Sequence, residues 1–140
     1  MIFLDTNVIS ETLRKSPDPA VMAWLVAHDD SLAIPSVTIA EIAFGIAKIR
    51  PDERSALLQR GLDAWRGRFA GRIFAFTEQA ALVYGDLMGA AHRAGAALSA
   101  PDGMIAAITL VNQGRLASRN TRDFTALSVP LINPWDASAP

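Results

Sequence analysis

Cysteine is absent from the 140 residues of this chain. Its absence excludes disulfide bonds, thiol nucleophiles and every zinc site built on thiolates. A bound metal ion would therefore need oxygen or imidazole ligands. The two histidines, His28 and His92, lie in different segments without metal-type spacing, which favours oxygen ligands for any cation.

Long apolar runs and an excess of charge are also lacking. No uninterrupted apolar run reaches the roughly 18 residues that a membrane span requires. The N-terminus has no basic stretch followed by an apolar block, so we expect a cytoplasmic protein with no membrane association. The net charge of −1 does not show the basic excess typical of nucleic-acid-binding proteins. A nucleic-acid partner must therefore be argued from local clusters.

The composition that is present favours one compact domain. Hydrophobic residues make up 51% of the chain and charged residues 19%, which suits a folded core at this length. There is no internal repeat, low-complexity segment or linker. We expect a single domain over residues 1–136, followed by a short C-terminal tail, residues 137–140, that frays.

Short apolar segments alternate with helical patterns along the chain. The strand candidates are residues 1–4, 32–34, 73–76, 116–118 and 129–132, and helical patterns occupy 19–28, 37–49, 54–69, a segment between Thr77 and Gly95, 101–112 and a short turn after Asn120. The strand candidates are apolar throughout, as in sheets covered on both faces. The sequence therefore predicts a three-layer α/β/α sandwich with a mostly parallel central sheet.

Polar residues follow two of the predicted strands directly. Asp5 ends the first strand, and residues 118–123 follow a later one. In open α/β folds, ligands bind beyond the carboxyl ends of the strands, so these segments should share one crevice. Asp5 and Asp123 are therefore candidates for the same site.

Two more carboxylates lie at positions that can face this crevice. The helix over 37–49 is apolar except at Thr38, Glu41, Gly45 and Lys48, whose spacing places them on one stripe. Glu41 should therefore face a polar place. Asp102 begins the helix over 101–112 and can face the same crevice.

Each carboxylate also has a local explanation that the sequence leaves open: an Asx turn at Asp5, solvent for Glu41, and capping boxes pairing Ser99 with Asp102 and Asn120 with Asp123. A cluster of these carboxylates would need a further explanation, because two carboxylates about 4 Å apart repel by roughly 4 kcal/mol at an effective dielectric constant of 20. Protons or a cation must then lie between them. Mg²⁺ and Mn²⁺ take carboxylate oxygens and can bridge to a phosphate.

Four segments of the chain resemble a known family. IFLDTNVIS at the start, SVTIAEIAFGI, DGMIAAI, and LASRNTRDF followed by INPW are similar to PIN domains, in particular the VapC- and FitB-type toxins of bacterial toxin–antitoxin pairs. The segments occur in the family's order over almost the whole chain. The resemblance therefore covers the fold as well as the candidate site.

The resemblance implies a metal-dependent endoribonuclease with a three-layer α/β fold, using one or two Mg²⁺ or Mn²⁺ ions and leaving a 5′-phosphate and a 3′-hydroxyl. It also implies a cognate antitoxin and a homodimer. Some relatives carry an acid where Asn120 stands, which leaves the number of metal ions open. By matching positions, the acidic quartet would be Asp5, Glu41, Asp102 and Asp123, supported by the polar residues Thr6 and Asn120.

Basic residues that could hold RNA fall in two places. Arg119 and Arg122 lie near the predicted crevice and are the better candidates, although each could pair with an acid instead. Seven of the 13 basic residues lie between Lys48 and Arg72, where they could bind phosphates or form ordinary charge pairs on a solvated helix face.

Two rival functions were weighed against a nuclease. Phosphatases of the haloacid dehalogenase type also begin with a strand ending in Asp, but they need a second Asp two residues later, where this chain has Asn7. The other rival is a PIN-like module that binds RNA or protein without cutting. The complete acidic quartet argues against that module but leaves it open.

Overall fold

The computed structural model describes residues 1–136 and 138–140 and is built on a five-stranded sheet. The strands are β1 (Ile2–Leu4), β2 (Leu32–Pro35), β3 (Ile73–Phe74), β4 (Arg115–Ala117) and β5 (Leu131–Ile132). Their order is β3-β2-β1-β4-β5, and every pair is parallel. The first strand therefore lies at the centre of the sheet.

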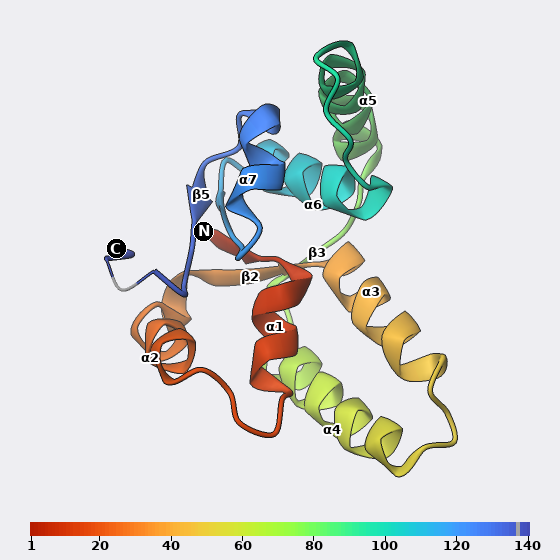
Figure 1. The fold of residues 1–140 in the computed structure, drawn as a ribbon, viewed down its shortest axis with the longest axis vertical. Helices are drawn as coiled ribbons and strands as arrows, with labels where there is room; N and C mark the ends of the chain where they lie inside the picture. The colour runs from red at the N-terminus through yellow and green to blue at the C-terminus, as the bar shows by residue number, and fades with distance from the viewer. Residues whose placement is uncertain (137) are drawn as a thin grey trace.

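Helices cover both faces of this sheet (Figure 1). The helices of the described residues are α1 (Thr6–Thr12), α2 (Pro19–Ala27), α3 (Ser36–Ala47), α4 (Glu53–Arg68), α5 (Glu78–Arg93), α6 (Ala100–Val111) and α7 (Thr121–Phe124), with 3₁₀ turns η1 (Asp29–Ser31) and η2 (Thr125–Leu127). All predicted strands and helices are present, with ends shifted by a few residues. The predicted three-layer sandwich is confirmed.

The alternation of side chains along β1 separates the core into two layers. Ile2 and Leu4 point to one face, where they pack with residues of α1, α2, α3 and α4. Phe3 points to the other face and packs with residues of α5, α6 and α7. All three side chains are almost completely buried. This burial on both faces explains why the strand is apolar at every position.

Helix α1 was not predicted from the sequence. It has only seven residues, and isolated helices of that length are unstable in water. Asp5 stabilises its start, because the Asp5 carboxylate accepts a hydrogen bond from the Thr6 N–H at 2.8 Å. Val8 and Ile9 are buried in the core beneath it. The helix thus depends on tertiary packing that no local pattern reveals.

The end of the chain packs against the body of the protein. Residue 137, where the predicted tail begins, lies outside the described residues. The Trp24 indole N–H donates to the carbonyl of Pro140 at 3.1 Å, and Ala139 packs against the core. Residues 139 and 140 therefore contact the body of the protein, while the expectation that the tail frays stays a prediction.

No helix among the described residues is both long enough and apolar enough to span a membrane.

Candidate active site

Asp5 lies at the carboxyl end of the central strand and is only 3% exposed. Its backbone N–H donates to the carbonyl of Ala117, which fixes it against the end of β4. One carboxylate oxygen caps α1. The other accepts hydrogen bonds from the Ser118 hydroxyl at 2.7 Å and the Asn7 amide at 3.2 Å. The Asx-type cap anticipated at Asp5 is present, within a larger polar network.

Burial shifts the titration of this carboxyl group. The pKa of Asp5 is raised from 3.8 to about 6, mainly by loss of hydration and to a smaller extent by the negative charges of Asp102 and Glu41. The hydrogen bonds from Ser118 and Thr6 oppose the shift, because they favour the ionised form. Near neutral pH the site therefore holds a carboxylate at a cost in folding free energy.

Glu41 reaches the same site from α3. Its carboxylate accepts a hydrogen bond from the Thr6 hydroxyl at 2.5 Å, so Glu41 is not simply a solvent-facing residue. Thr38, one turn earlier, is fully buried and donates to the carbonyl of Leu4 at 2.9 Å. The predicted polar stripe is therefore wrong at Thr38, which ties α3 to the end of β1 and so sets the position of Glu41.

Asp102 approaches from the first turn of α6. Its N–H donates to the Ser99 hydroxyl at 3.2 Å, which confirms the predicted cap. The side chain is half-buried, and burial raises the pKa of Asp102, with further increases from the charges of Glu41 and Asp123. Capping and membership of the acidic cluster are thus compatible at this position.

Asp123 lies in α7 and is exposed. The predicted cap of this helix by the Asn120 side chain is wrong, because that side chain makes no capping hydrogen bond. The backbone N–H of Asn120 instead donates to the Ser118 hydroxyl at 3.0 Å. The capping box therefore does not explain Asp123, whose charge acts on Asp102.

The four carboxylates influence one another although they come from distant parts of the chain. Asp5 responds to Asp102 and Glu41, and Asp102 responds to Glu41 and Asp123. As they stand, no three Asp, Glu or His side chains in the described part of the chain form a group that could hold a metal ion. The donor set is nevertheless all oxygen and mutually repulsive, which fits a hard divalent cation once the side chains draw together.

Ser118 and Asn7 belong to the site but were not identified as site residues from the sequence. Ser118 is fully buried, and its hydroxyl donates to Asp5 while accepting from Asn120 and from Asn7. The Asn7 carbonyl oxygen accepts from the Arg119 N–H at 3.2 Å. The available signal was the place of Ser118 directly after a strand, in the segment expected at the crevice.

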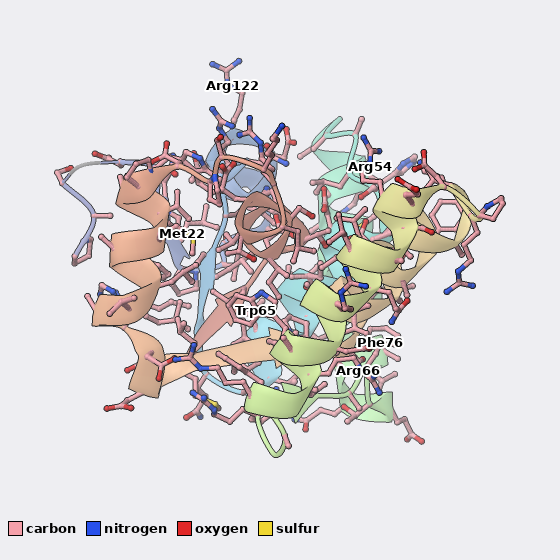
Figure 2. All side chains as sticks on the ribbon, turned by 90° about the horizontal axis from the view of Figure 1, so that it is seen from below. Met22, Arg54, Trp65, Arg66, Phe76 and Arg122 are labelled. Atoms are coloured by element: carbon pink, nitrogen blue, oxygen red, sulfur yellow. The ribbon has the colours of Figure 1, made fainter. Side chains whose placement is uncertain are left out.

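The candidate RNA-binding residues differ in their surroundings. The Arg119 guanidinium lies 5.2 Å from the centre of the Trp135 ring, so its partner is aromatic rather than acidic. Arg122 is exposed and projects away from the body of the protein (Figure 2). It takes part in none of the ion pairs of residues 1–136 and 138–140.

Four of the seven basic residues between Lys48 and Arg72 fall into two groups. Arg66 pairs with Asp63 at 3.3 Å, and Arg68 pairs with Asp29 at 2.7 Å. These pairs agree with the ordinary reading of a solvated helix face. Lys48 and Arg54 instead line a groove beside the site.

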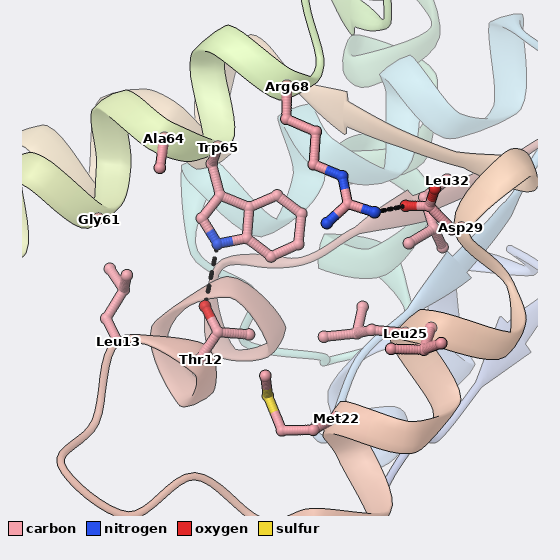
Figure 3. Close-up of a pocket in the computed structure, with 11 residues that line it drawn as sticks. Thr12, Leu13, Met22, Leu25, Asp29, Leu32, Gly61, Ala64, Trp65 and Arg68 are labelled. Carbon is pink, nitrogen blue, oxygen red and sulfur yellow. Dashed lines mark hydrogen bonds and ion pairs between the residues drawn. The ribbon is translucent and has the colours of Figure 1, made fainter.

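Two neighbouring hollows share Thr12, Leu13 and Gly61 in their walls. The larger has a volume of about 1340 Å³ and begins at Thr6 and Glu41. The smaller, of about 340 Å³, lies between α2 and α4 and contains none of the four carboxylates (Figure 3). Its walls include Trp65, whose N–H donates to the Thr12 hydroxyl, and the Arg68–Asp29 pair. Only the larger hollow connects with the acidic site.

A parallel three-layer sandwich with acidic residues near the carboxyl ends of its strands is an α/β domain, and domains of this class bind ligands beyond the carboxyl ends of the strands. The family model described as "PIN domain" matches residues 2–129. The chain therefore belongs to the PIN domain family, as its sequence segments indicated.

Named relatives extend this result over the full chain. "VapC ribonuclease Y4jK" of Sinorhizobium fredii is 38% identical over 138 residues, covering 97% of this chain and 99% of that protein. "Toxin FitB" of Neisseria gonorrhoeae is 38% identical over 141 residues, covering 96% and 99%. The crystal structure of FitAcB from Neisseria gonorrhoeae superposes with a TM-score of 0.88 at 36% identity, covering 96% and 99%. The predicted kinship with VapC- and FitB-type toxins is confirmed.

The burial of Asp5 leads to a stability prediction. Because its pKa is higher in the folded state, the folded protein binds more protons than the unfolded chain between about pH 4 and pH 6, and stability falls as pH rises through that range. Asp5→Asn removes the charge and should raise the free energy of unfolding at pH 7 by about 1 to 3 kcal/mol. Urea unfolding at pH 7 and pH 4 measures this.

The gain from Asp5→Asn should shrink at pH 4, where the native carboxyl group is largely protonated. Asp86→Asn, at an exposed carboxylate of α5, is the control for loss of one negative charge. An equal gain at both pH values, or none at pH 7, would show that burial does not strain this carboxylate.

Removing the Ser118 hydroxyl should raise the pKa of Asp5 further, because the ionised form loses its strongest hydrogen bond. We expect Ser118→Ala to cost about 1 to 3 kcal/mol of stability, since the Asp5 carboxylate and the Asn120 N–H lose a buried partner. Carboxyl-carbon NMR titration of Asp5 measures the pKa, with the exposed Ser31→Ala as the control. An unchanged pKa with lower stability would reduce Ser118 to a packing residue.

Proposed function

We propose that this protein is a Mg²⁺- or Mn²⁺-dependent endoribonuclease that acts in the cytoplasm as the toxin of a toxin–antitoxin pair. The observation that carries the proposal is the electrostatic influence of Glu41 and Asp102 on Asp5, and of Glu41 and Asp123 on Asp102, in a chain of the PIN domain family. The names of the relatives, a VapC ribonuclease and a FitB toxin of nearly the same length, support the same reading.

The four carboxylates would hold the cation, and neighbouring side chains would keep them in place. Ser118 and Asn7 donate to Asp5, and Thr6 donates to Glu41. A divalent cation bound here would supply a water of lowered pKa and would offset negative charge on the phosphodiester. Asn120, three residues before Asp123, would be a further polar residue of the site.

Water is the proposed nucleophile. The hydroxyls nearest the carboxylates, those of Thr6 and Ser118, already donate to Glu41 and Asp5. The chain has no cysteine, and neither His28 nor His92 takes part in the hydrogen bonds of this network among the described residues, so neither a thiolate nor an imidazole would supply the nucleophile. Hydrolysis by water would leave a 5′-phosphate and a 3′-hydroxyl on the cleaved RNA.

The proposed partners are RNA, an antitoxin and a second copy of the chain. Arg119 and Arg122 follow Ser118 at the edge of the site and would contact the RNA backbone, Arg122 more freely because Arg119 lies against Trp135. The structure of FitAB bound to an IR36 DNA fragment superposes with a TM-score of 0.87 at 36% identity. That assembly supports a cognate antitoxin that binds and silences this protein.

A module that binds RNA without cutting it is the second candidate. The observation in its favour is that, within the described residues, the carboxylates do not stand ready-made as a metal-binding group. Metal-dependent cleavage separates the two candidates directly.

Cleavage should require both a divalent cation and Asp5. Antitoxin-free protein incubated with end-labelled structured and single-stranded RNAs should cut in Mg²⁺ or Mn²⁺ and not in EDTA. Asp5→Asn should lose about 100-fold or more of the activity, because removing one charged group from an electrostatic site typically costs that much. Its fold should remain, as shown by circular dichroism.

Asp86→Asn controls for loss of a carboxylate away from the site, and it should cut like the parent. RNA binding by the parent without cleavage in any metal would favour the non-cutting module. Cleavage by Asp5→Asn at the parent rate would remove Asp5 from the proposed site.

Cation binding should also be visible without any activity. Because a cation would relieve repulsion within the acidic cluster, Mg²⁺ or Mn²⁺ should raise the melting temperature of the parent. Asp5→Asn should show a smaller rise, while Asp86→Asn should match the parent. Equal shifts in all three proteins would mean that the cation acts elsewhere.

A further inference from the structure

The larger groove begins at the acidic site and extends away from it. Thr6 and Glu41 line its inner end, and α1, α3, α4 and the segment after α1 contribute its walls. Its volume of about 1340 Å³ is far larger than a single bound ion needs. A ligand bound at the carboxylates could therefore continue along the protein through this groove.

The charge of the groove is opposite to that of the site. Glu41 is its only acidic lining residue among the described part of the chain, whereas the basic lining residues are Arg14, Lys15, Lys48 and Arg54. Arg14 pairs with the buried Glu11 at 3.1 Å. The other three belong to no ion pair of residues 1–136 and 138–140, and all three are exposed. Lys48 Nζ lies 5.4 Å from the centre of the Phe44 ring, a contact that leaves its charge unneutralised. The charges of all three are thus available to an anionic ligand.

We propose that this groove holds the RNA backbone on one side of the scissile phosphate, with Lys15, Lys48 and Arg54 contacting its phosphates. The inference rests on the proposed nuclease function and adds the path of the substrate. An acidic site repels a polyanion, so attraction must come from cations placed beside it. A strand cut within its length must also continue past the carboxylates, and this groove starts there.

The floor of the groove indicates how the strand is gripped. Its apolar lining residues are aliphatic, including Ile42, Ile46 and Leu58, and no aromatic side chain of the described residues lines it. The floor of the groove therefore offers bases no aromatic surface on which to stack, although the exposed ring of Phe44 lies beside Lys48. Binding in the groove should be mainly electrostatic, strongly dependent on salt and only weakly selective for base identity.

Buried contacts fix the segment that carries Lys15. Glu11 is 4% exposed and accepts hydrogen bonds from the Arg14 guanidinium and from the Asp18 N–H at 2.9 Å. On the opposite wall, α4 packs so closely that a Cβ on Gly61 would lie 2.5 Å from Leu13. The segment that carries Lys15 and the helix that carries Arg54 are thus both fixed by close packing.

The test measures RNA binding in the Asp5→Asn background with EDTA, so that the probe survives. Fluorescence anisotropy of a labelled, unstructured, mixed-sequence RNA oligonucleotide would be followed over a series of NaCl concentrations. Lys15→Gln, Lys48→Gln and Arg54→Gln should each weaken binding several-fold at low salt. Each should also lower the slope of log K against log salt by about 0.7, the value for one lost phosphate contact to a single strand.

Arg60→Gln is the matched control, because Arg60 is exposed on the same helix as Arg54 but does not line the groove. Affinity and salt slope should be unchanged in this variant. Thermal unfolding of all variants checks that each is folded.

The outcomes distinguish failure of the proposed RNA path from failure of the proposed nuclease function. If the parent cleaves RNA while the groove variants bind it like Arg60→Gln, the path is wrong and the proposed function stands. If the parent neither binds nor cuts RNA, both are wrong. If the groove variants keep RNA affinity but lose binding to poly-L-glutamate, the groove serves an acidic protein segment instead.

Discussion

The burial of a carboxylate at the end of the central strand is the constraint on which the site depends. Parallel pairing of Leu4 with Ala117 brings the ends of β1 and β4 side by side, so that the next residues, Asp5 and Ser118, meet. Burial penalises the charge of Asp5, and hydrogen bonds from its neighbours offset part of that penalty. The protein thus keeps an unfavourable buried charge at the position where the proposed chemistry needs a carboxylate.

The same strand end organises the surrounding helices. Asp5 caps α1, and the carbonyl of Leu4 accepts the hydroxyl of Thr38, which holds α3 in place. Thr6 then joins the two helices through its bond to Glu41. Residues that stabilise the fold and residues that form the site are therefore neighbours. A substitution in one group should alter the geometry of the other.

The charge of the molecule is organised locally although its sum is nearly zero. A net charge of −1 gives no hint of a polyanionic substrate. In three dimensions, however, an acidic centre borders a groove whose free charges are positive. This arrangement suits a nuclease, which must bind a cation and a polyanion at adjacent places. Arg66 and Arg68, in contrast, form ion pairs with Asp63 and Asp29.

The sequence by itself determined the succession of strands and helices along the chain, except for helix α1, because apolar runs and helical spacing record which faces are buried. It also identified the cap at Ser99, whose hydrogen bond spans only three residues. It placed four carboxylates at positions that can face one crevice. These features are local, or follow from the rule that parallel strands end at the same edge of a sheet.

Only the tertiary structure decided the rest. Helix α1 exists because Val8 and Ile9 are buried, and Thr38 turns inward because the end of β1 offers it a carbonyl. The bond between Ser118 and Asp5 joins residues 113 positions apart. No local pattern encodes such a contact, since its partners meet only when the sheet forms. The division of the basic residues into paired and free ones has the same origin.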